Sequence, residues 1–283
     1  MPTKPKAKDP ISEALESETK ADPDSPTTDT FAGLDITVPA AIGQGTNILI
    51  YGESGVGKTV LSGSASIVKD MDPVLFIDVE GGTLSLKEFY PDCKVIRVKS
   101  WVELQRVADE FLKGKAPFKT VVIDSLTEIQ KLSMSDIMKK AVREDPTKDP
   151  DMPGIREWGK NAEQTRRFIR AFRDLPVNTI FTALASVDKD DKGRQVTRPM
   201  MNGKIAGELP GLVDIVLFTY VKQQGDDHKR LLLTTNTNNV MAKDRSNKLP
   251  AVMQNPTMQD IYGRIIGTVQ GEESEQDQTE AQE

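Results

Sequence analysis

The sequence is poor in the side chains that most often bind metals or act as nucleophiles, since its 283 residues include one cysteine and one histidine. Cys93, being alone, excludes an internal disulfide and a cysteine-based metal cluster, and it fits a reducing compartment such as the cytoplasm. His228, as the only histidine, excludes His-dependent catalytic triads and metal sites built from histidines. The chemistry of this chain must therefore rest on other residue types.

Long apolar runs are also missing. No stretch approaches the ~20 apolar residues that a membrane-spanning helix requires. The charged N-terminal residues 1–8 are followed by no apolar segment, so they do not resemble a signal peptide. We therefore predict a cytoplasmic protein with no membrane partner.

The net charge of −6 has its origin at the C-terminal end, because residues 271–283 contain six acidic residues and no lysine or arginine. Such a tail is usually solvated and disordered; the alternative is that it competes with nucleic acid for a basic surface of the same chain. The N-terminal residues are rich in Lys, Asp, Ser, Thr and Pro and cannot bury a core. We predict disordered tails over residues 1–37 and 268–283, and one folded domain over residues 38–267.

Within this domain, apolar runs that predict strands alternate with segments of helical spacing, which is typical of an α/β fold with a mostly parallel central sheet flanked by helices. The expected strands cover residues 47–51, 74–79, 94–98, 120–124 and 178–184. The expected helices include residues 102–112, 125–143, 155–175 and 258–266. A late β-hairpin is predicted at 213–235, and polar loops at 144–154 and 185–204.

The most informative segment is residues 52–59, Gly-Glu-Ser-Gly-Val-Gly-Lys-Thr, which fits the phosphate-binding pattern G-x-x-x-x-G-K-[ST] between a predicted strand and a predicted helix. Its glycines let the backbone N–H groups point at phosphate oxygens. Lys58 is expected to reach the β- and γ-phosphates, and the Thr59 hydroxyl to hold Mg²⁺. The predicted nucleotide-binding residues are Gly52, Glu53, Ser54, Gly55, Val56, Gly57, Lys58, Thr59 and Val60.

Two acidic segments accompany this loop. Residues 121–124, Val-Val-Ile-Asp, form a hydrophobic strand that ends in Asp124, the expected second Mg²⁺ residue. Residues 76–82, Phe-Ile-Asp-Val-Glu-Gly-Gly, allow three interpretations. Glu80 is the base that activates water, or Glu80 caps the following glycine turn, or Asp78 and Gly81 form the D-x-x-G sensor of a GTPase.

A GTPase also needs an N-K-x-D segment to bind guanine. Residues 247–250, Asn-Lys-Leu-Pro, come near this pattern but lack the carboxylate, and they follow no predicted strand. We therefore favour Glu80 as a catalytic residue together with Lys58, and ATP with Mg²⁺ as the cofactors. The predicted enzyme is an ATPase.

The order of these motifs resembles a RecA-type recombinase core, which implies a RecA-like P-loop fold. The segments Gly-Glu-Ser-Gly-Val-Gly-Lys-Thr, Asp-Val-Glu-Gly-Gly and Ala-Lys-Asp-Arg resemble most those of small phage ATPases, known as AAA-domain nucleotide-binding proteins or single-strand annealing proteins of the fourth Sak group. The resemblance covers roughly residues 40–267. It implies a phage-encoded protein of the host cytoplasm that oligomerises on single-stranded DNA, with a single-strand-binding protein as a further candidate partner.

The resemblance also implies roles for basic residues. Lys243 and Arg245 match the place from which recombinases reach the γ-phosphate of the next subunit; the alternative is an ordinary surface pair. Two loops bind DNA in that family. The acidic counterpart at 144–155 suits this role poorly, whereas the basic counterpart at 185–204 can follow a phosphate backbone through Lys189, Lys192, Arg194 and Arg198.

Two departures limit the resemblance. The basic loop has no aromatic residue for base stacking, and the preceding strand, Thr182-Ala183-Leu184, lacks the glutamine that senses the γ-phosphate in recombinases. We therefore predict annealing or support of recombination rather than complete strand exchange. The main alternative is a nucleotide-dependent switch that binds a protein partner and has no direct DNA role; a GTPase or a nucleotide kinase fits less well.

Overall fold

The computed structural model describes residues 30–35, 45–189, 192–224 and 227–268. The chain divides into two units, residues 1–43 and 44–283. In the first unit, β1 (Thr30–Phe31) and β2 (Leu34–Asp35) pair in an antiparallel manner. Most of the two predicted tails lies outside the described residues, so their disorder and the boundaries at 37 and 268 remain predictions.

The second unit is built on a ten-stranded sheet whose main path has the order β12-β10-β9-β3-β7-β6-β4-β5. Its strands along this path are β3 (Asn47–Gly52), β4 (Val74–Asp78), β5 (Lys94–Arg97), β6 (Thr120–Asp124), β7 (Asn178–Lys189), β9 (Ile215–Gln224), β10 (Asp227–Leu233) and β12 (Val252–Gln254). From β9 to β5 all neighbouring strands are parallel. Strands β3, β4 and β6 are buried along their whole length, as expected for parallel strands covered on both faces.

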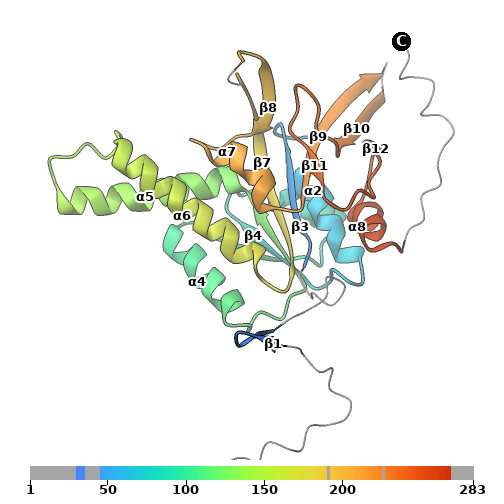
Figure 1. Ribbon diagram of the computed structural model, residues 1–283, viewed down its shortest axis with the longest axis horizontal. Helices are drawn as coiled ribbons and strands as arrows, with labels where there is room; N and C mark the ends of the chain where they lie inside the picture. The colour runs from blue at the N-terminus through green and yellow to red at the C-terminus, as the bar shows by residue number, and fades with distance from the viewer. Residues whose placement is uncertain (1–29, 36–44, 190–191, 225–226, 269–283) are drawn as a thin grey trace, which may run out of the picture. The chain divides into compact units, whose positions relative to one another are not determined.

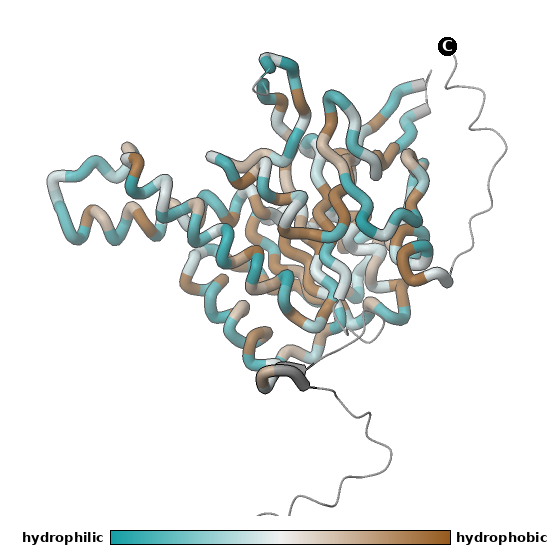
Figure 2. Tube along the Cα trace, viewed as in Figure 1, coloured by the Kyte–Doolittle hydropathy of each residue, from teal (hydrophilic) through white to brown (hydrophobic). Residues whose placement is uncertain are grey.

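Helices cover both faces of this sheet (Figure 1). They are α2 (Lys58–Gly63), α3 (Leu86–Phe89), α4 (Trp101–Leu112), α5 (Leu126–Glu144), α6 (Ile155–Arg173), α7 (Ile205–Leu212) and α8 (Met258–Ile266). One apolar core joins the sheet to α4, α5, α6 and α7, and a second joins it to α2 and α8. Figure 2 shows the hydrophobic segments concentrated in the central strands. The predicted α/β fold class, with a mostly parallel sheet flanked by helices and a late hairpin, is confirmed.

One predicted loop is wrong. Residues 185–204 were expected to be an irregular polar loop, but β7 continues to Lys189 and pairs with β8 (Gln195–Pro199) in an antiparallel hairpin, and α7 follows directly. The hairpin projects from the sheet in Figure 1. Its charged residues conceal the period-two pattern, in which Val187 lies opposite Thr197 and Asp188 opposite Val196. In α7, the helix breakers Gly207, Pro210 and Gly211 hid the helix from prediction.

The α5–α6 pair forms a second projection, because α5 and α6 run side by side away from the sheet (Figure 1). The loop between them, predicted at 144–154, is confirmed. Among the described residues, no helix has the length and apolar character needed to cross a membrane.

Candidate nucleotide-binding site

The predicted phosphate loop connects β3 to α2. Its turn uses positive φ angles of 80° at Gly55 and 92° at Gly57, a region that favours glycine. At Gly52, a Cβ would lie 2.2 Å from the carbonyl oxygen of Thr219, so the neighbouring strand β9 leaves no room for a side chain. The nine predicted nucleotide-binding residues therefore run from the end of β3 into the first turn of α2, and their binding of a nucleotide remains a prediction.

The Lys58 ammonium lies over the loop itself. Its Nζ donates hydrogen bonds to the carbonyl oxygens of Gly52 (3.1 Å) and Glu53 (2.7 Å). Burial lowers the pKa of Lys58, and the nearby charges of Glu80 and Asp124 oppose this shift. Lys58 is thus a buried cation held by neutral carbonyl groups, to which a phosphate would offer stronger, charged partners.

Thr59 and Asp124, the two predicted Mg²⁺ residues, lie together. Asp124 Oδ2 accepts a hydrogen bond from Thr59 Oγ1 at 2.8 Å, and Asp124 Oδ1 accepts one from Thr182 Oγ1 at 2.5 Å. Hydroxyl and carboxylate oxygens suit Mg²⁺, which usually takes one or two protein ligands and completes its shell with phosphates and water. The described residues contain no group of three or more His, Cys, Asp or Glu side chains placed to hold a metal. The residues present fit Mg²⁺.

Glu80 and Asp78 have different surroundings. Asp78 is buried and holds the turn after β4, since it accepts hydrogen bonds from the Gly81 N–H (2.6 Å) and from the Thr83 hydroxyl (3.1 Å). Glu80 is exposed, and its carboxylate has no hydrogen bond or ion pair with any described residue. The capping role belongs to Asp78, which leaves Glu80 available for chemistry.

The turn that carries Glu80 lies at the Mg²⁺ residues. The Glu80 N–H donates to the carbonyl of Asp124 at 3.2 Å. A Cβ on Gly82 would lie 3.9 Å from Thr59 Oγ1 and 4.0 Å from Asp124 Oδ2. The strand order explains this meeting, because β3, β6 and β4 are parallel and bring their carboxyl ends to one edge of the sheet.

Comparison with known families identifies the family of the chain. The family model described as "AAA domain" matches residues 44–246, which include the phosphate loop, Glu80 and Asp124. The chain belongs to the AAA domain family.

Other comparisons are more distant. Among solved structures, the KaiC-like protein PH0186 from the hyperthermophilic archaeon Pyrococcus horikoshii OT3 is similar to this AAA domain, with 18% sequence identity and a TM-score of 0.42 over 67% of this chain and 78% of that one. No curated protein sequence matches.

Two residues of the AAA domain near the nucleotide site were missed at the sequence level. Thr182 in β7 is one, because β7 lies between β3 and β6 and brings its hydroxyl to Asp124. Arg230 in β10 is the other, since its Nε donates to the carbonyl oxygen of Val56 at 2.8 Å. Neither residue belongs to a local motif, so only the strand order could have revealed them.

Lys243 and Arg245, the predicted cations for a neighbouring subunit, lie at β11 (Lys243–Asp244), which pairs with the start of β9. Lys243 Nζ donates to the carbonyl oxygens of Pro210 and Val213, and burial lowers its pKa. Arg245 forms an exposed ion pair with Asp214 at 2.6 Å. Both residues therefore have partners within their own chain, and their action on another subunit remains a prediction.

The four predicted DNA-binding residues lie on the β7–β8 hairpin. Lys189 is exposed near the end of β7. Arg198 is paired with Asp188 at 2.7 Å, and this contact lowers the pKa of Asp188. Lys192 and Arg194 follow the turn, on the approach to β8. All four basic residues therefore lie on one projecting hairpin. Arg198 also stabilises this hairpin through its ion pair with Asp188.

This hairpin is connected to the nucleotide site by hydrogen bonds at its base. The Tyr51 hydroxyl, from the strand that precedes the phosphate loop, donates to the carbonyl of Thr197 (3.2 Å) or Met241 (2.5 Å). Thr127, three residues after Asp124, accepts from the Leu184 N–H at 3.1 Å. The hairpin base is therefore fixed to both β3 and the start of α5.

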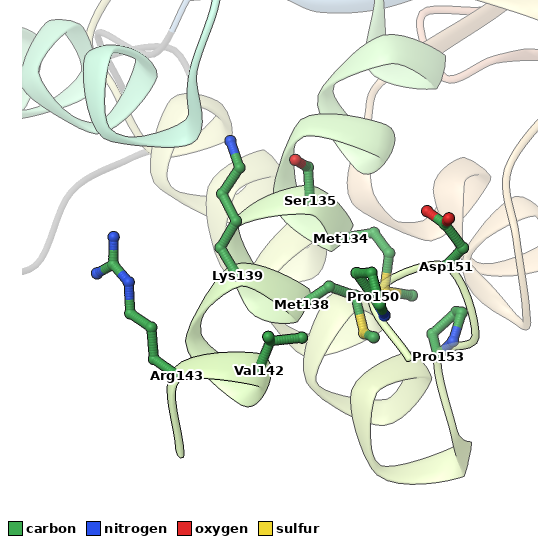
Figure 3. A pocket seen from close by; sticks show the side chains of 9 residues that line it. All are labelled: Met134, Ser135, Met138, Lys139, Val142, Arg143, Pro150, Asp151 and Pro153. Carbon is green, nitrogen blue, oxygen red and sulfur yellow. The ribbon is translucent and has the colours of Figure 1, made fainter. Parts of the chain in front are cut away.

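A surface pocket of about 560 Å³ lies elsewhere, on α5 and the loop that follows it (Figure 3). Its wall combines apolar and basic side chains, among them Met134, Met138, Val142, Lys139 and Arg143. None of its residues belongs to the phosphate loop or to the acidic strand ends. This pocket is therefore separate from the candidate nucleotide-binding site.

Proposed function

We propose that this chain is an ATPase that assembles on single-stranded DNA and assists recombination by annealing. The observation that carries the proposal is the meeting of Lys58, Thr59, Asp124 and an unengaged Glu80 at the carboxyl ends of three parallel strands. A phosphate loop, a Mg²⁺ pair and an available base are the parts that hydrolysis of a nucleoside triphosphate requires.

Each residue has one task in this mechanism. The N–H groups of the loop and the Lys58 ammonium bind the phosphates and stabilise the charge that develops as the γ-phosphate leaves. Thr59 and Asp124 would hold Mg²⁺, which would neutralise phosphate charge when bound. Glu80 accepts the proton of the attacking water, since its exposed carboxylate is hydrogen-bonded to no described residue.

Adenine is the base that we propose, for two reasons. The N–H group of Gly81, which a GTPase would use to sense the γ-phosphate, is already bonded to Asp78. The Lys248 ammonium, which a guanine site would need, donates instead to the carbonyl of Ile265 at 2.6 Å. Both observations favour ATP over GTP.

Single-stranded DNA is the partner that we propose for the β7–β8 hairpin. The hairpin carries Lys189, Lys192, Arg194 and Arg198, and a basic projecting element can follow a phosphate backbone without reading its sequence. Its base contacts β3 and the start of α5, so a change at the phosphates has a short route to the hairpin even without the glutamine of recombinases.

The deciding experiment compares ATP hydrolysis with and without single-stranded DNA. We expect hydrolysis in the presence of Mg²⁺ that rises when DNA is added, and no hydrolysis by Lys58→Ala in either condition. Hydrolysis by Lys58→Ala at the wild-type rate would contradict the ATPase. Hydrolysis that is independent of DNA, together with no DNA binding, would leave the ATPase and remove the DNA partner.

In that second case a nucleotide-dependent switch with a protein partner is the better proposal. The α5–α6 projection favours it, because Ile155 is 93% exposed and Met152 71% exposed close to the pocket of Figure 3. Exposed apolar side chains of this kind are typical of protein contacts. A partner that binds the ATP-loaded chain but not Ile155→Ser would identify this function.

A further inference from the structure

Arg230 lies on the phosphate loop although it comes from β10, two strands away from β3. Its Nε donates to the carbonyl oxygen of Val56 at 2.8 Å. Its guanidinium also covers Gly57, where a Cβ would lie 2.5 Å from both Cζ and Nη2. The arginine is therefore packed against the backbone of the loop at two successive residues.

The backbone of β10 and of the segment after β12 fixes the position of this arginine. The Arg230 N–H donates to Asn255 Oδ1 at 3.0 Å, and the Asn255 N–H donates back to the Arg230 carbonyl at 2.8 Å. Asn255 adopts a positive φ of 45°, which asparagine tolerates better than most residues. The pair anchors the strand at the residue whose side chain reaches the loop.

Within the part of the chain that the structure describes, the positive charge of Arg230 has no anionic partner. Among the described residues, no carboxylate lies within ion-pair distance of its guanidinium, whereas Arg166, Arg173, Arg198 and Arg245 all have one. The hydrogen bond to Val56 uses one of the five N–H donors that an arginine carries. The remaining donors and the charge suit a phosphate group.

The strand order indicates which phosphate. Strands β7, β6 and β4 lie on one side of β3 and bring Asp124 and Glu80, and hence the γ-phosphate end, to that side. Strands β9 and β10 lie on the other side and bring Arg230. A nucleotide seated on the loop with its γ-phosphate toward Glu80 therefore has its α-phosphate and nucleoside toward Arg230.

We propose that Arg230 is a nucleotide-binding residue that contacts the α-phosphate and at the same time fixes the loop at Val56 and Gly57. This inference rests on the proposed nucleotide-binding function and adds the residue that binds the end of the ligand away from hydrolysis. ADP and ATP both carry an α-phosphate, so Arg230 contributes equally to the binding of both. It contributes little to the rate of the chemical step.

The test is calorimetric titration of the full chain with Mg²⁺-ADP and with a non-hydrolysable ATP analogue. Arg230→Gln keeps a donor for the Val56 carbonyl but removes the charge, so we expect both dissociation constants to rise by the same factor, roughly tenfold. Arg230→Lys, which keeps the charge, should recover most of the affinity.

Lys229→Gln is the matched control, because it removes the same charge from the adjacent residue, whose side chain points to the opposite face of β10. Wild-type affinities for this variant are expected. If Lys229→Gln weakens binding as much as Arg230→Gln, the loss of affinity comes from the long-range electrostatic potential and not from a contact with the phosphate. If Arg230→Gln loses affinity for the ATP analogue alone, Arg230 contacts the γ-phosphate. If its affinity for both ligands is unchanged, Arg230 only stabilises the loop. Each of these three results would overturn the proposal.

The same titrations separate this inference from the proposed function. A wild-type chain that binds neither ligand would refute nucleotide binding altogether. A wild-type chain that binds both, a Lys58→Ala variant that binds neither, and an Arg230→Gln variant that binds as wild type would refute the role of Arg230 alone. Thermal unfolding without nucleotide shows whether each variant is folded.

Discussion

Among single residues, the contrast between Asp78 and Glu80 is the most informative. Asp78 ends β4 and Glu80 follows two residues later, yet the Asp78 carboxylate accepts two hydrogen bonds within its turn, while the Glu80 carboxylate has none with any described residue. A residue that is conformationally constrained by its neighbours and a residue that is free for chemistry thus lie two positions apart. The assignment of the base rests on this difference.

Glu80→Gln is expected to keep nucleotide affinity and to lower ATP turnover roughly a hundredfold or more, because the amide cannot accept the proton of the attacking water. Steady-state hydrolysis and equilibrium binding measure the two effects separately. Glu88→Gln, which removes an exposed acid from the nearby helix α3, is the control and should hydrolyse normally. Equal rates for the two variants would return Glu80 to a structural role.

Thr182→Val tests the hydroxyl that orients Asp124. The change removes the hydrogen bond to Asp124 Oδ1 at nearly constant volume, so the carboxylate loses its orientation toward Mg²⁺. We expect the Mg²⁺ concentration for half-maximal hydrolysis to rise, on the order of tenfold. Thr179→Val in the same strand removes a similar buried bond, to the Phe172 carbonyl, and should leave the Mg²⁺ dependence unchanged.

At the scale of elements, one buried carboxylate, that of Glu157, holds the loop that joins α5 to α6. Glu157 Oε1 pairs with Lys148 at 2.7 Å and Oε2 accepts from the Gly154 N–H at 3.0 Å, although Glu157 is only 3% exposed. This arrangement lowers the pKa of Glu157, with the hydrogen bond from Lys148 as its first cause. The loop between the two helices is therefore held to the first turn of α6.

Glu157→Gln should lower thermal stability at neutral pH and speed hydrogen exchange in residues 145–154. A carboxyl group whose pKa is lowered by folding stabilises the protein above the unfolded value of ~4.3. This stabilisation is lost as the pH falls through the lowered, folded value. The difference between variant and wild type should thus be complete at pH 7 and shrink below pH ~4.3. Glu110→Gln, from an exposed pair, should show little difference at either pH.

The β7–β8 hairpin is the second element with a testable role. Replacing Lys189, Lys192, Arg194 and Arg198 by alanine should weaken binding to single-stranded DNA of any sequence. The logarithmic salt dependence should flatten by ~0.7 for each phosphate contact that is lost. Arg198→Ala alone should mainly loosen the hairpin, because it breaks the pair with Asp188. Unchanged DNA affinity in the quadruple variant would move the DNA site elsewhere.

The elements that were predicted correctly are those with a local signal. The strand ending in Asp124 and helix α8 have the predicted bounds because each is an uninterrupted apolar or periodic run with a clear stop. Strand β8 was missed because charged residues hide its alternating pattern. Helix α7 was missed because glycine and proline interrupt its helical sequence.

The candidate site divides in the same way. Lys58, Thr59, Glu80 and Asp124 follow from short motifs, whereas Thr182 reaches Asp124 only because β7 inserts between β3 and β6. The contact between Thr182 and Asp124 could therefore be predicted only from the order of the strands in the sheet, which the sequence motifs do not give.

At the scale of the whole molecule, a mixture of two inactive variants tests whether one subunit completes the site of another. If Arg245 acts on the neighbouring subunit, Arg245→Ala and Lys58→Ala should each be inactive alone, and a mixture of the two should recover part of the DNA-stimulated hydrolysis. Arg173→Ala, which breaks another exposed pair, is the control and should be active alone. A mixture that stays inactive would leave Arg245 as the partner of Asp214 within its own chain.

The central place of β3 in the sheet has a consequence for biosynthesis. This strand is the first of its unit to leave the ribosome, yet Ile48 pairs with Ile180 on one side and with Ile215 on the other. Translation at about 5–20 residues per second separates the emergence of these partners by on the order of ten seconds. Until then this strand, which is buried along its whole length in the folded unit, has no place in a sheet. Its apolar residues expose the nascent chain to aggregation and make chaperone capture an expected stage of its production. The nucleotide site thus comes into being late, when nearly the whole unit has been synthesised.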